Sequence, residues 1–431
     1  MSEIRKKIFG LIKEYYSKEI SLKKISGVPV AGKTFNEKEL ISAVDAVLDC
    51  WWTDGKFAKE FEEKLKRFLG TRNAILVNSG SSANLLALMS LTSEKLGGRQ
   101  LKEGDEVITV AAGFPTTVNP IIQAGCVPVF CDVDVMTGNV DIDELKKAVS
   151  HKAKAVVLAH TLGNPFNIKE VIKLCREKDL WLIEDNCDAL GSKYGGKYTG
   201  TFGDISTFSF YPAHHITMAE GGAVCTDNPQ LARIVRSMRD WGRDCVCGTG
   251  QDNACGKRFG WKLGELPFGY DHKYIFSEIG YNLKNTDINA AIGLAQLEKL
   301  PEFIRARRSN YDLLAKGLKR FEDHIMIQKA EPGSEPSWFG LLITISPGAN
   351  FSRKDLISFL ENNRIATRML FAGNITKQPY FKSIKYRKVS NLRNTDLVMN
   401  NSFWIGVYPG LQKNQIDYVL SKFSDFFCKI K

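Results

Sequence analysis

The sequence predicts an α/β protein with a mostly parallel sheet and helices on both of its faces. Between residues 72 and 227, short apolar runs alternate with helical patterns. Apolar residues fill these runs continuously, which is typical of strands that are buried on both faces. The chain has 431 residues, more than one hydrophobic core usually supports, so a second domain is expected.

The expected strands are short, and most are rich in β-branched residues. They cover residues 73–77, 106–110, 127–131, 155–159, 181–184, 205–211 and 222–226. The helical patterns between them cover residues 81–93, 141–149 and 168–178. Parallel sheets bind their ligands at the carboxyl ends of the strands, so the chemistry is expected in the loops that follow these runs.

The remaining patterns divide the chain into parts. Residues 1–60 are expected to form an N-terminal helical arm, and residues 61–300 a large domain that ends with a helix over 287–300. Glycines, charges and cysteines dominate residues 239–273, which predicts a loop inserted into that domain. Residues 301–431 predict a smaller C-terminal α+β domain, with a strand at 340–345 and a last helix at 413–427.

Composition narrows the class of protein. Hydrophobic residues make up 44% and charged residues 25%, which is ordinary for a globular protein. No apolar run reaches the roughly 20 residues of a membrane span, and no signal-peptide pattern is present, so a cytoplasmic protein without a membrane partner is expected. The net charge of +11 is spread along the chain. A solvated surface or attraction of an anionic substrate would each explain it, and no nucleic-acid-binding motif accompanies it.

The chain contains ten cysteines. A disulfide framework is not expected for a protein of the cytoplasm. Three of them crowd into one polar, glycine-rich stretch: Cys245, Cys247 and Cys255. Six scattered cysteines are expected to be apolar fillers. These six are Cys50, Cys126, Cys131, Cys175, Cys225 and Cys428.

Three segments carry the pattern of a cofactor site. A buried strand ends at Glu184 and Asp185, a glycine/serine turn over 77–83 joins a strand to a helix, and the segment 208–222 contains two adjacent histidines. The turn could bind a phosphate through backbone N–H groups and the helix N-terminus. Alone, each of these signals is weak.

In this order and spacing, the three segments resemble the sugar aminotransferase branch of the fold-type-I pyridoxal-phosphate enzymes, which share the aspartate aminotransferase fold. The resemblance begins at residues 51–55 and runs through 280–297. It implies that Asp185 pairs with the pyridine nitrogen, that Phe114 stacks on the ring and that Asp188 lies near the cofactor. It also implies phosphate contacts, to which Asn282 would contribute from the neighbouring subunit of a homodimer. The phosphate contacts within the chain would be Gly80, Ser81 and Ser209.

One departure from the family stands at position 214. Family aminotransferases carry there the lysine that binds the cofactor covalently, whereas this chain has His214 and no lysine between Lys197 and Lys257. An imidazole cannot form a stable Schiff base, but it can act as a base near neutral pH. We therefore expect pyridoxamine phosphate without a covalent link. The expected reaction is removal of the 3-hydroxyl from a 4-keto-6-deoxy sugar, with His214 as the catalytic base.

The cysteine spacing distinguishes between relatives that lack the lysine. Successive gaps of 57, one and seven residues separate Cys187, Cys245, Cys247 and Cys255. This spacing resembles the CDP-4-keto-6-deoxyglucose 3-dehydrases, which implies a 2Fe-2S cluster on these four residues. It also implies a CDP-linked substrate and a separate NAD(P)H-dependent flavin/iron–sulfur reductase. On spacing alone, zinc or unpaired thiols remain open.

The resemblance implies a role in 3,6-dideoxyhexose synthesis for O-antigen lipopolysaccharide. Tyr211, His215 and Phe339 are expected near the sugar, although core or pocket-wall positions would explain them equally well. Three alternatives remain open: a nucleotide-sugar aminotransferase, a metal-free GDP-sugar 3-dehydratase and a non-catalytic, zinc-stabilised homologue.

Overall fold

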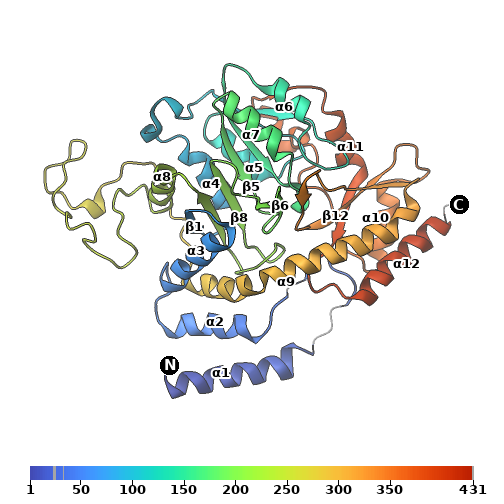
Figure 1. Ribbon diagram of the computed structural model, residues 1–431, viewed down its shortest axis with the longest axis horizontal. Helices are drawn as coiled ribbons and strands as arrows, with labels where there is room; N and C mark the ends of the chain where they lie inside the picture. The colour runs from blue at the N-terminus through green and yellow to red at the C-terminus, as the bar shows by residue number, and fades with distance from the viewer. Residues whose placement is uncertain (23–25, 33, 430–431) are drawn as a thin grey trace.

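The computed structural model describes residues 1–22, 26–32 and 34–429. Its centre is an eight-stranded sheet in the order β1-β9-β8-β5-β4-β2-β3-β14 (Figure 1). Strand β9 runs antiparallel to β1 and β8, and every other neighbouring pair is parallel. The strands are β1 Asn73–Val77, β2 Glu106–Val110, β3 Val127–Cys131, β4 Ala153–Ala159, β5 Trp181–Asp185, β8 Ile205–Ser209, β9 Gly222–Thr226 and β14 Arg387–Lys388. The predicted α/β class and the seven predicted strands are confirmed, with small differences at the strand ends.

Both faces of this sheet are buried, as continuous apolar runs require. Ile75 and Ile183 belong to the core on the side of α4 and α8, whereas Leu76 and Leu182 point to the opposite face. Successive side chains of a strand point to opposite faces, so each run serves two cores. The helices of the large sheet are α3 Lys56–Leu69, α4 Gly80–Ser90, α5 Pro115–Gln123, α6 Ile142–Ala148, α7 Ile168–Glu177 and α8 Pro229–Arg239.

Helix α9, Asp287–Leu318, is longer than predicted. The expected end at residue 300 was wrong, because the helix continues through Pro301 for about another five turns. Its first half packs on the core below β1 and β8, and its second half on the core of the C-terminal sheet. Burial on both sides of the proline outweighs the one hydrogen bond that proline removes. The domain boundary expected at residue 300 thus falls within one helix, and the division into domains stays a prediction.

The C-terminal part is α+β, as predicted. Its antiparallel sheet has the order β10-β12-β15-β13, covered by α10 and α12. These elements, with α11, are β10 Ile325–Ile327, β12 Gly340–Ile345, β13 Thr367–Arg368, β15 Ser402–Gly406, α10 Arg353–Asn362, α11 Arg393–Asn401 and α12 Lys413–Lys429. A small third sheet, β11-β6-β7, contains β6 Lys193–Tyr194, β7 Lys197–Tyr198 and β11 Ser334–Glu335.

Two helices precede the large sheet. Helix α2, Glu37–Leu48, packs on α9, whereas α1, Glu3–Tyr15, lies outside α2 and has no buried residue (Figure 1). The inserted loop predicted over 239–273 lies within a longer segment, residues 240–286, which joins α8 to α9 and projects from the body beyond α8 (Figure 1). Within the described ranges, no helix is long and apolar enough to cross a bilayer.

Candidate active site

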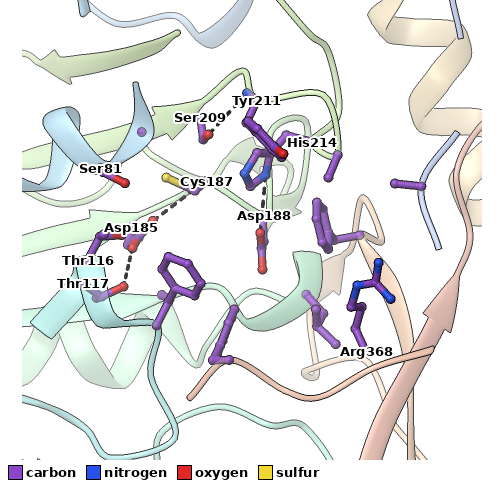
Figure 2. A pocket seen from close by; sticks show the side chains of 18 of the residues that line it. Ser81, Thr116, Thr117, Asp185, Cys187, Asp188, Ser209, Tyr211, His214 and Arg368 are labelled. Atoms are coloured by element: carbon purple, nitrogen blue, oxygen red, sulfur yellow. Dashed lines mark hydrogen bonds and ion pairs between the residues drawn. The ribbon is translucent and has the colours of Figure 1, made fainter. Parts of the chain in front are cut away.

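A cavity of about 760 Å³ opens at the carboxyl ends of β4, β5 and β8, where the sheet topology places ligands (Figure 2). Most of the predicted site residues line it. These are Gly80, Ser81, Phe114, Asp185, Cys187, Asp188, Ser209, Tyr211, His214 and Phe339. They come from five separate stretches of the chain, so the fold alone brings them together.

Asp185, the last residue of β5, is held by three donors. Its carboxylate accepts hydrogen bonds from Asn84 Nδ2 at 2.8 Å, Thr117 Oγ1 at 2.7 Å and the Cys187 backbone N–H at 3.2 Å. Thr207 Oγ1 in turn donates to Asn84 Oδ1 at 2.5 Å, which directs the amide nitrogen of Asn84 towards Asp185. Such a carboxylate, fixed in one orientation, suits a protonated ring nitrogen.

Sequence reasoning missed Asn84 and Thr117 as supports of Asp185. Thr117 lies in the Gly-Phe-Pro-Thr-Thr motif after β2, and Asn84 lies in the helix that follows the glycine/serine turn. Their closeness to these two segments became a usable signal only once the strand order was known. The pairing with Asp185 depends on the contact between α4, α5 and β5, which no local pattern encodes.

The turn between β1 and α4 forms a cradle at a helix N-terminus. Ser79 caps the helix by accepting a hydrogen bond from the Ser82 N–H at 3.0 Å. A Cβ atom on Gly80 would lie 2.4 Å from the Cβ of Ser209, so only glycine fits there. Backbone N–H groups and the hydroxyls of Ser81 and Ser209 therefore face the cavity from two sides, which suits a phosphate.

His214 stands in the turn that follows β8. Its Nδ1 lies 3.5 Å from Oδ1 of Asp188, and its ring centroid is 5.1 Å from that of Phe339 (Figure 2). Burial lowers the pKa of His214 to about 4. The imidazole is therefore neutral near pH 7 and free to accept a proton.

Asp188 and a buried arginine complete the floor of the site. Burial, reinforced by the charge of Asp185, raises the pKa of Asp188 to about 8. Arg307, on α9, donates to the backbone oxygens of His214 at 3.1 Å and Trp338 at 3.1 Å, and burial lowers its pKa to about 9. Through these hydrogen bonds, Arg307 links the turn that contains His214 to the C-terminal part of the chain. No pattern in the sequence predicted this role of Arg307.

The outer wall of the cavity is open. Phe114 and Tyr211 are about half exposed, and the space continues past Phe339 towards Arg368. Arg368 Nη1 donates to the Thr367 backbone oxygen at 2.8 Å. This region has room for a substrate beside the predicted cofactor position.

Of the residues predicted to contact cofactor or sugar, two lie outside this cavity. His215 is buried behind it, and its Nε2 lies 2.7 Å from the Ser337 backbone oxygen, which is the contact of a structural histidine. Asn282 is at the base of the inserted loop, where its Oδ1 accepts a hydrogen bond from Lys284 Nζ at 2.8 Å. Contact of Asn282 with a neighbouring subunit stays a prediction.

The four cysteines of the predicted cluster are not gathered in one place. Cys187 lines the cavity, whereas Cys245, Cys247 and Cys255 lie on the projecting loop. Nowhere in the described part of the chain do three or more histidine, cysteine or acidic side chains meet in a metal-binding group. The residue types suit a thiolate-bound metal, but their placement within this single chain does not.

Comparisons with known proteins agree with the fold. Residues 35–424 match the family model described as the DegT/DnrJ/EryC1/StrS aminotransferase family. The lipopolysaccharide biosynthesis protein RfbH of Salmonella typhimurium is 54% identical over 99% of this chain and 98% of its own length. The dTDP-4-dehydro-2,6-dideoxy-D-glucose 3-dehydratase of Saccharopolyspora spinosa is 50% identical over 99% of this chain and 93% of its own.

A solved structure extends the comparison to three dimensions. The Escherichia coli GDP-4-keto-6-deoxy-D-mannose-3-dehydratase with bound hydrated PLP superposes with a TM-score of 0.84 at 31% identity. The match covers 93% of this chain and all of that one. The predicted aspartate aminotransferase-like fold is therefore confirmed.

Proposed function

Because the chain belongs to the DegT/DnrJ/EryC1/StrS aminotransferase family, we propose that it is a vitamin B6-dependent 3-dehydratase of a nucleotide-linked 4-keto-6-deoxy sugar. The observation that carries this proposal is His214 at the cavity floor, where family aminotransferases have lysine. Among the described residues, no lysine lines the cavity. A B6 cofactor would thus bind without a covalent link, as pyridoxamine phosphate.

The residues present fit that cofactor. Asp185 would face the ring nitrogen, Phe114 the ring plane, and the cradle of Gly80, Ser81 and Ser209 the phosphate. Nδ1 of His214 and Oδ2 of Asp188 are buried polar atoms without a hydrogen-bond partner among the described residues, and both side chains line the cavity. When bound, the protonated ring draws electrons away from the carbon that bears its amine.

His214 has the properties of the base. Its neutral imidazole can take a proton from that carbon, and the resulting cation can return a proton to the 3-hydroxyl as it leaves as water. Asp188, whose carboxyl lies 3.5 Å from Nδ1, would orient the ring. Phe339 and the half-exposed Tyr211 would exclude water from one side of the substrate.

The charge at the outer part of the cavity and the names of the relatives support the class of substrate. Arg368 places a positive charge at the outer part of the cavity, which suits the diphosphate of a sugar nucleotide. We propose CDP as the nucleotide on the resemblance of the sequence, while the named relatives act on dTDP- and GDP-linked sugars. The 54% identity to a lipopolysaccharide biosynthesis protein supports a dideoxysugar for lipopolysaccharide as the product.

We further propose that the protein is a homodimer whose four cysteines bind a 2Fe-2S cluster. The donor set supports this, because the sulfurs of Cys247 and Cys255 each accept a backbone N–H, at 3.3 and 3.4 Å. Conversion of a 3-dehydrated sugar into a deoxy sugar requires two electrons. A separate NAD(P)H-dependent flavin/iron–sulfur reductase would supply them.

A substrate panel tests the proposed reaction. Enzyme loaded with pyridoxamine phosphate is incubated with CDP-, dTDP- and GDP-4-keto-6-deoxyhexose in ¹⁸O-labelled water, and the sugars are analysed by mass spectrometry. We expect solvent oxygen at carbon 3, or loss of one water, for at least one nucleotide, and neither with His214→Asn. Formation of a 4-amino sugar from pyridoxal phosphate and glutamate would instead identify an aminotransferase.

A further inference from the structure

The position of Cys187 conflicts with that of the three loop cysteines. Cys187 follows Asp185 by two residues and lines the cavity at the end of β5. Cys245 and Cys247 lie beside each other on the loop that projects from the body beyond α8 (Figure 1). A cluster bound by all four residues of one chain would require this loop to turn back.

The stem of the loop opposes such a turn. Backbone hydrogen bonds join Trp241 N to Tyr281 O at 2.6 Å and Asp244 N to Ile275 O at 3.0 Å. The two sides of the stem touch so closely that a Cβ on Gly242 would lie 1.8 Å from the Glu278 backbone oxygen. The two sides of the stem are therefore paired with each other. This pairing fixes the direction in which the loop leaves α8.

Side chains fix the end of the stem next to the first cysteine. The carboxylate of Asp244 is paired with Lys95 Nζ at 3.3 Å and accepts a hydrogen bond from Ser277 Oγ. Glu278 accepts a hydrogen bond from Ser93 Oγ at 2.7 Å and pairs with Lys95 at 3.2 Å. Cys245 directly follows Asp244, so moving it to the cavity of its own chain would break these contacts.

The projecting loop also presents apolar side chains to solvent. Val246 is 68% exposed, Phe268 74% and Ile279 86%. Exposed apolar groups on a projecting segment suit contact with another protein surface. The cavity that contains Cys187 is open on its outer side, where Phe114 and Tyr211 are about half exposed.

We propose that the metal-binding set is assembled between two copies of this chain. Cys245, Cys247 and Cys255 of one copy would meet Cys187 of the other, so each dimer would contain two shared sites. A second copy is the proposed source of the fourth thiol, because the stem contacts hold Cys245 away from Cys187 of its own chain. This inference rests on the proposed cluster.

A complementation experiment tests the shared site. Two chains with different affinity tags, one carrying Cys187→Ala and the other Cys245→Ala with Cys247→Ala, are co-expressed, and the mixed dimer is purified on both tags without oxygen. Iron and sulfide per dimer are then measured after reconstitution. We expect close to half of the wild-type content in the mixed dimer and almost none in either variant alone.

The iron content and the recovery of the mixed dimer distinguish failure of the shared site, of the cluster and of the dimer. Iron in wild-type protein but none in the mixed dimer would mean that all four ligands come from one chain, which overturns the shared site. Wild-type protein without iron would overturn the cluster itself, and failure to recover any doubly tagged protein would overturn the dimer. Cys126→Ala, at a buried cysteine away from both sets, is the control and should retain full iron content. Circular dichroism and thermal unfolding of each variant, compared with wild type, show whether the chain has folded.

Discussion

Nδ1 of His214 lies 3.5 Å from Oδ1 of Asp188 at the floor of the cavity, and each side chain retains less than a fifth of its exposure. A neutral base thus stands beside a buried acid. From the resemblance of the sequence, we expect His214 to stand where family aminotransferases carry the lysine that binds their cofactor.

Replacing His214 by asparagine should separate chemistry from binding. The amide fills a similar space but cannot accept a proton, so dehydration should fall by about 10²–10⁴-fold. Affinity for pyridoxamine phosphate, measured by fluorescence titration, should change less than about threefold. Normal dehydration by the variant would show that another group is the base.

Gly80→Ala should weaken cofactor binding through a steric clash. The added methyl would lie 2.4 Å from the Cβ of Ser209 and push β8 away from the α4 N-terminus. We expect at least a tenfold loss of affinity for pyridoxamine phosphate and about 1–3 kcal/mol of lost stability. Gly98→Ala is the matched control, because the space around Gly98 is open. Equal affinities for the two variants would contradict the proposed cradle.

Asp188→Asn should stabilise the protein without cofactor in a pH-dependent way. The pKa of Asp188, about 8, lies above the value near 4 of an exposed aspartate, so wild-type stability falls as pH rises through this window. The asparagine variant lacks that penalty. We expect it to be more stable by about 2–4 kcal/mol at pH 8 and equal to wild type near pH 4. Thermal unfolding at both pH values measures the difference, and a constant offset would argue against a buried acid.

Glu184 should be essential for the stability of the loop after β7. Its buried carboxylate accepts hydrogen bonds from the backbone N–H groups of Gly200, Phe202 and Gly203, and from His160. Burial alone would raise its pKa, but His160 and these N–H groups hold it below the ordinary value. Its contribution is therefore present above about pH 4 and lost as pH falls through the depressed pKa.

Glu184→Gln should lower the free energy of unfolding at pH 7 by about 3 kcal/mol, because it leaves donors without an acceptor. Denaturant titration measures this loss. Glu14→Gln, in an exposed pair with Lys18, should change stability by less than about 0.5 kcal/mol. A similar small change at Glu184 would show that its hydrogen bonds are dispensable.

The sequence predicted the parts whose physical cause is local. Buried parallel strands leave continuous apolar runs, so β1 to β5 and their order along the chain could be predicted. The place of His214 followed from its spacing after Ser209. Arg307 could not be predicted, since one arginine in a long helix has no pattern. The end of α9 was predicted wrongly at Pro301, because tertiary packing outweighed the local helix-breaking effect of proline. The cysteine spacing likewise predicts a ligand set only by resemblance, and it cannot tell whether the four residues would come from one chain.

Intact-mass analysis after borohydride reduction tests the central claim most directly. Wild-type protein and His214→Lys are each incubated with one equivalent of pyridoxal phosphate, reduced, denatured and weighed. We predict that wild-type protein keeps its unmodified mass, whereas His214→Lys gains one phosphopyridoxyl group at position 214. A stoichiometric phosphopyridoxyl adduct on wild-type protein, mapped to a cavity residue, would contradict a cofactor bound without a covalent link.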